Sequence, residues 1–170
     1  YHQSATWFES NGFRELQPHV NFPYKRDARR LFPMSKTAEY TYRGNIVFTE
    51  LNHGYINPLG EKYKEQILKA TSNTHLWARE NSSAINYTAH YLFNEYMNWG
   101  LINLRVMDVV PEDEQQKLTD RVDLIMTKHR GFIKFTEFSA FLMHLYKNRT
   151  SGTSIADLYP EIIEWFEHSN

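Results

Sequence analysis

Two short polar stretches carry the side chains with the best-defined chemistry. The first reads Thr49-Glu50-Leu51-Asn52-His53. A zinc hydrolase of the H-E-x-x-H type needs two histidines one helical turn apart, so that both imidazoles reach one ion. It also needs a glutamate beside the first histidine, to take a proton from the zinc-bound water. Positions 49 and 53 share one helix face and Glu50 borders it, but Thr49 stands where the first histidine is required.

The second stretch is centred on Glu95, which falls in the middle of a predicted long helix among Tyr91, Tyr96 and Trp99. A carboxylate buried among aromatic rings needs a partner, because an unpaired buried charge is very costly. His53 or a metal ion could be that partner, so we expect these two side chains to converge on one small pocket. A Glu-x-x-His spacing also occurs by chance, and the alternative is a helix with one buried, hydrogen-bonded histidine.

Segments 48–58, 94–102 and 145–163 together resemble a known family. The first is similar to the pattern H-E-F-x-H-x-x-V-N-P, and the second is similar to the helix expected to supply a third zinc ligand. The last is similar to closing Y-x-x-N-R and F-Y-P-x-I elements. These patterns belong to an uncharacterised bacterial family, a domain of unknown function regarded as gluzincin-like zinc metallopeptidases. The resemblance runs from about residue 45 to residue 170.

The resemblance implies a role for each site residue. Glu50 would be the general base, His53 the second zinc ligand and Glu95 the third, while Thr49 occupies the position of the lost first ligand. A neutral hydroxyl is a poor zinc ligand, and two protein ligands fall short of the three that a catalytic zinc normally has. Zinc is therefore expected to bind weakly or not at all.

Three functions are compatible with a threonine at the first ligand position. The first is a metallopeptidase-like domain with a degenerate metal site, a pseudoenzyme that serves as a binding or scaffold module. The second is an active zinc-dependent peptidase that recruits another ligand. The third is a helical interaction module without metal chemistry. No remaining histidine has a spacing that favours it as the replacement ligand, and His90 lies five residues before Glu95, which turns it away on a straight helix.

The elements that position these residues are predicted to be mainly helical, with α+β as the alternative, and to comprise a two-helix active-site core and a small N-terminal sheet. Residues 1–44 are expected to be irregular, with short strands or a short helix around Asp27–Phe32, and to be the remainder of a longer or processed chain. Residues 45–170 are expected to form the helical domain. Its periodicity and stop signals predict helices at 45–54, 61–69, 84–106, 111–128, 132–148 and 154–166. A strand is the alternative for the first of these, and the last is expected to bend or restart at Pro160.

Composition limits the partners. The chain has 170 residues, no cysteine and a net charge of -1, so thiolate chemistry is excluded and no basic excess favours nucleic acid. No apolar run reaches the length of a membrane span. A peptide or protein is the expected partner. The family likeness and the lack of cysteine favour a bacterial envelope or secreted location, with the cytoplasm left open.

Overall fold

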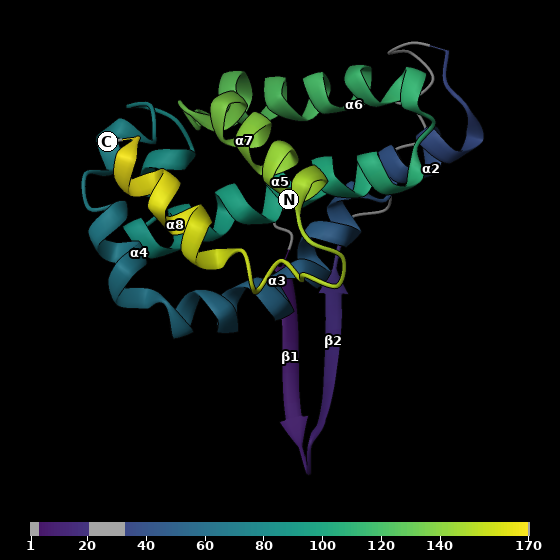
Figure 1. Cartoon of the computed structure of the whole chain (residues 1–170). Helices are drawn as coiled ribbons and strands as arrows, with labels where there is room; N and C mark the ends of the chain where they lie inside the picture. Colours follow the sequence, from purple (N-terminus) through teal and green to yellow (C-terminus); the bar gives the residue numbers. More distant parts are fainter. Residues whose placement is uncertain (1–3, 21–32, 170) are drawn as a thin grey trace.

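The helices that carry the two polar stretches, α3 and α5, pack against each other, with α3 on the side of the helical body that bears the hairpin (Figure 1). The computed structural model describes residues 4–20 and 33–169. Helix α3 covers Asn45–Lys62 and α5 covers Ala89–Val109. The other α-helices are α2 (Lys36–Arg43), α4 (Lys64–Ala70), α6 (Glu112–Leu124), α7 (Phe135–Asn148) and α8 (Tyr159–His168). The predicted mainly helical fold is confirmed.

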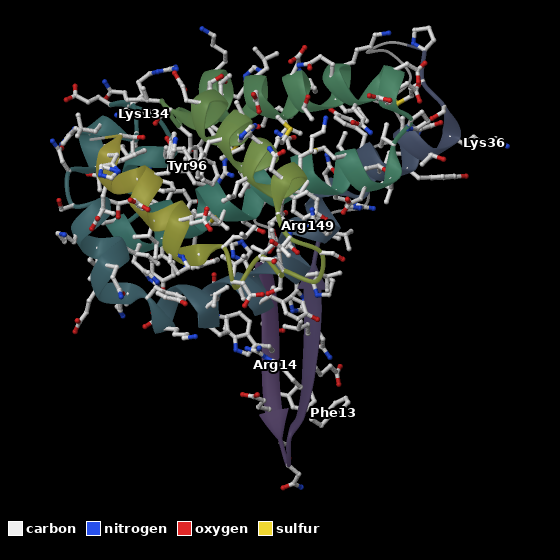
Figure 2. The ribbon with its side chains drawn as sticks, in the orientation of Figure 1. Phe13, Arg14, Lys36, Tyr96, Lys134 and Arg149 are labelled. Atoms are coloured by element: carbon white, nitrogen blue, oxygen red, sulfur yellow. The ribbon has the colours of Figure 1, made fainter. Side chains whose placement is uncertain are left out.

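The N-terminal residues form a β-hairpin that projects from the helical body (Figure 1). Strands β1 (Ser4–Ser10) and β2 (Phe13–His19) pair antiparallel across a two-residue Asn11-Gly12 turn with φ of 51° and 77°. Positive φ at both positions is what an Asn-Gly hairpin turn requires. Figure 2 shows Phe13 near the tip, away from the helices. The small sheet is thus confirmed, while the element predicted around residues 27–32 lies outside the described residues.

Helix α5 is held by an aromatic core on the side away from the hairpin. Tyr96 is fully buried, and its hydroxyl donates a 2.8 Å hydrogen bond to the carbonyl of Trp77. Its ring meets Phe132 and Phe138 edge-on, a geometry that adds stabilisation beyond the buried area. Figure 2 shows Tyr96 inside the helical body. None of the helices in the described part of the chain has the length and hydropathy needed to span a lipid bilayer.

The predicted end of the first helix at Gly54 is wrong, because α3 continues through Gly54 and Pro58 to Lys62. A Cβ at position 54 would overlap the methyl groups of Leu16 on β2. Gly54 therefore serves the close approach of the hairpin to α3 and does not end the helix. Pro58 removes one backbone hydrogen bond, and the packing of α3 against α5 and the hairpin outweighs that loss.

The predicted start of the long helix at Ser82-Ser83 is also wrong. Helix α5 begins after Thr88, and residues 84–86 form a short 3-10 helix. The two serine hydroxyls donate to the carbonyls of Arg79 and Arg130, and Ser83 makes no side-chain cap bond to the short 3-10 helix. A local bond of Ser82 and a tertiary bond of Ser83 thus stand in place of the capping role that their sequence position suggested. Helix α7 begins at residue 135, later than predicted, and α8 begins at residue 159, next to the restart predicted at Pro160.

The contact between Gly54 and Leu16 gives a first prediction about the hairpin. Gly54→Ala is expected to loosen β1 and β2, because the new methyl group displaces Leu16 and an isolated hairpin is marginal in water. Hydrogen exchange of amides 4–19 should become at least about fivefold faster, the equivalent of about 1 kcal/mol. In the double variant with Leu16→Ala, the Gly54→Ala change should have no further effect. Unchanged exchange in the single variant would contradict this packing.

Candidate functional site

The four residues singled out from the sequence line one open cavity of about 640 Å³ between α3, α5 and the hairpin. Thr49, Glu50 and His53 reach it from α3, and Glu95 reaches it from α5. Strand β1 contributes Trp7 to the wall. The fold therefore brings together every residue to which the resemblance gave a role, whereas those roles stay predictions.

His53 and Glu95 converge as expected. Nε2 of His53 lies 3.4 Å from Oε1 of Glu95 and 2.9 Å from Nδ2 of Asn98. Nδ1 of the same ring lies 3.4 Å from Oδ1 of Asn57. Asn98 and Glu95 are three residues apart on α5 and so share a face, while Asn57 is one turn after His53 on α3. The imidazole is thereby held from both ring nitrogens and oriented toward the cavity.

Arg130 is the main feature of the site that the sequence did not indicate. Its Nη2 donates to Oε2 of Glu95 at 2.7 Å and to the hydroxyl of Tyr87 at 2.9 Å. The guanidinium also lies over the rings of Trp99 and Phe132, at 5.0 and 5.1 Å from their centroids. Charge-assisted bonds and aromatic faces together hold this cation firmly.

The backbone around Arg130 explains how it reaches α5. Residues 125–130 form a π-helical turn that extends α6, and Gly131 ends it with φ of +86°. A wider turn changes the direction of its last side chains relative to a regular helix. Gly131 permits the sharp exit into Phe132, which packs on Tyr96 of α5. The packing of Phe132 on Tyr96, which is part of the core, therefore also places Arg130 beside Glu95.

Thr49 and Glu50 differ in how their polar atoms are satisfied. The buried hydroxyl of Thr49 donates to the carbonyl of Ile46 at 2.8 Å, within α3. Glu50 is only 7% exposed and makes no hydrogen bond or ion pair with any other described residue. Burial raises the pKa of Glu50, the charge of Glu95 raises it further, and His53 and Arg130 oppose the shift. Burial likewise raises the pKa of Tyr87.

The side chains of Thr49, His53 and Glu95 do not form a suitable ligand set for a catalytic zinc ion. Oε2 of Glu95 is occupied by a permanent cation, and the Thr49 hydroxyl is engaged by its own helix. Within residues 4–20 and 33–169, no three His, Asp or Glu side chains are arranged to hold a metal. A zinc ion beside Glu95 would also meet the charge of Arg130 at close range. That zinc binds weakly or not at all stays a prediction. The charge of Arg130 is a second physical reason for it.

The other described histidines do not replace the missing ligand. His90 is buried with its Nδ1 3.6 Å from Glu61, and His19 pairs with Thr6 at the base of the hairpin. His53 is the histidine that lines the cavity among the described residues. Asn98 could have been found from the sequence, since it lies one turn after Glu95.

Comparisons of the chain with protein-family models, with curated proteins and with solved structures found no match. The resemblance to the metallopeptidase-like family therefore stays a prediction, and the arguments about function depend on the sequence and on the geometry of this cavity.

Proposed function

We propose that this chain is a metallopeptidase-like domain with a degenerate metal site, and that it works as a module that binds a peptide or protein segment. The observation that carries the proposal is the ion pair between Arg130 and Glu95, at 2.7 Å. It puts an organic cation on the carboxylate that the resemblance assigns to zinc.

A guanidinium replaces the charge of the metal and not its chemistry. It neutralises Glu95 and stays protonated at any physiological pH. It has no vacant coordination position, so it does not bind a water molecule and lower its pKa as zinc does. Without an activated water, Glu50 has no nucleophile to deprotonate. The arrangement supports ligand binding and gives no support to hydrolysis.

The cavity has the features of a binding site for a chain segment. It is open, and β1 runs along it with Trp7 in the wall. In the described residues β1 pairs with β2 on one side only, so its other edge has free backbone groups. A peptide can add to such an edge through main-chain hydrogen bonds while a side chain enters the adjacent pocket.

Metal analysis of protein purified without chelator tests the proposal. We expect zinc far below one ion per chain, and no cleavage of a peptide library in excess zinc. Stoichiometric zinc that is lost in both His53→Ala and Glu95→Ala would contradict the proposal. Cleavage that Glu50→Gln abolishes would contradict it too and would favour an active peptidase. Glu112→Gln, at an exposed position of α6, is the matched control for these changes.

A further inference from the structure

Two carboxyl groups line the cavity, and one of them has no hydrogen-bond or ion-pair partner among the described residues. Glu95 is paired with Arg130, and Nε2 of His53 lies 3.4 Å from its other carboxylate oxygen. Glu50 lines the same cavity, is 7% exposed, and has no partner among the described residues. A carboxylate withdrawn from water without a partner is unfavourable, so a cation that reaches Glu50 from outside gains an ion pair of low solvent screening.

Three of the hydrogen-bond donors of the cavity are already in use. Nη2 of Arg130 serves Glu95 and Tyr87, and the amide N–H of Asn98 points to His53. The Thr49 hydroxyl donates to its own helix. The acceptors that the described residues leave without a partner are the carboxyl group of Glu50 and Oδ1 of Asn98. A ligand that brings donors and positive charge complements these acceptors, and an anion does not.

Aromatic side chains at the cavity favour the same class of ligand. Trp7 is 43% exposed and Tyr91 is 53% exposed, and both line the wall near the carboxylate site. Ammonium groups are attracted to the faces of such rings. Trp99 already uses its ring in this way for Arg130, which leaves Trp7 and Tyr91 for a ligand.

We infer that the cavity binds the primary ammonium group of a peptide, with Glu50 as its ion-pair partner and Trp7 and Tyr91 flanking it. The inference rests on the proposed binding function and names its ligand chemistry. Glu50, which the resemblance makes a general base, becomes the group that selects the ligand. The ammonium can belong to a peptide amino terminus or to a lysine side chain.

Three alanine-based probes separate these sources in an NMR titration of the full chain. One probe is Ala-Ala-Ala amide with a free amino terminus, one is acetyl-Ala-Lys-Ala amide, and one is acetyl-Ala-Ala-Ala amide without any ammonium. We expect at least one ammonium-bearing probe to bind tenfold or more tightly than the neutral probe. Tighter binding of the first assigns an amino terminus, and tighter binding of the second assigns a lysine.

The variant Glu50→Gln keeps the shape of the side chain and removes its charge, so it should abolish the preference for ammonium. Glu112→Gln should leave that preference unchanged. Equal binding of all three probes, no binding of any, or an undiminished preference in Glu50→Gln would each overturn the inference. If one of these results is found and the protein still contains no zinc, the ligand inference fails but the proposed degenerate metal site stands. Stoichiometric zinc would instead refute the proposed function.

Discussion

Replacing Arg130 with Met is expected to lower the free energy of unfolding by about 3 kcal/mol, because Glu95 is left as a buried charge without its cation. The carboxylate is 10% exposed and the arginine side chain 20% exposed, so water compensates little. Met keeps much of the apolar volume over Trp99 and Phe132 and loses the cation–π contacts. Urea unfolding at pH 7, followed by circular dichroism, measures the change.

The double variant Arg130→Met with Glu95→Gln separates lost charge pairing from lost packing. Removing both charges should restore most of the stability, because the buried carboxylate is then neutral. Glu112→Gln is again the surface control and, because it removes one favourable charge from the first turn of α6, should change stability by at most about 1 kcal/mol. If Arg130→Met unfolds at the same urea concentration as the unchanged chain, the ion pair does not stabilise the fold. The proposal that Arg130 replaces the charge of zinc then loses its support.

The combination Thr49→His with Arg130→Met is expected to raise zinc affinity about a hundredfold or more over Thr49→His alone. Thr49→His places a second imidazole one turn before His53, and the loss of Arg130 frees Glu95 as a third ligand. It also removes a positive charge that opposes the ion by several kcal/mol at short range. Competition with a chromophoric chelator measures the affinity, and cobalt spectra report the coordination number.

Two controls make the zinc result specific. Adding His53→Ala to the double variant should cancel the gain, because only two protein ligands remain. Arg130→Met alone should gain little, since Thr49 still stands at the first ligand position. Equal zinc affinity in Thr49→His and in the double variant would mean that Arg130 does not block the site. The absence of any gain in both would mean that positions 49, 53 and 95 do not converge on one ion.

Local pattern predicted the helices well where a helix end depends on its own residues. Gly131 ends the segment before α7 in the left-handed conformation, as a glycine stop predicts. Pattern failed where a neighbour decides the outcome. Gly54 has the sequence features of a helix stop, but in the structure it contacts Leu16. Leu16 is 38 residues earlier in the chain, so the local sequence around Gly54 does not reveal this contact.

The sequence by itself determined that Thr49, Glu50 and His53 border one helix face and that Glu95 lies in an aromatic helix that packs tightly. Both follow from the 3.6-residue period, which is a property of the local chain. The tertiary structure alone decided which cation neutralises Glu95. Arg130 is 35 residues away and reaches it through a π-helical turn and the packing of Phe132 on Tyr96. Coulomb interactions depend on distance in space, and folding sets that distance between residues far apart in the chain.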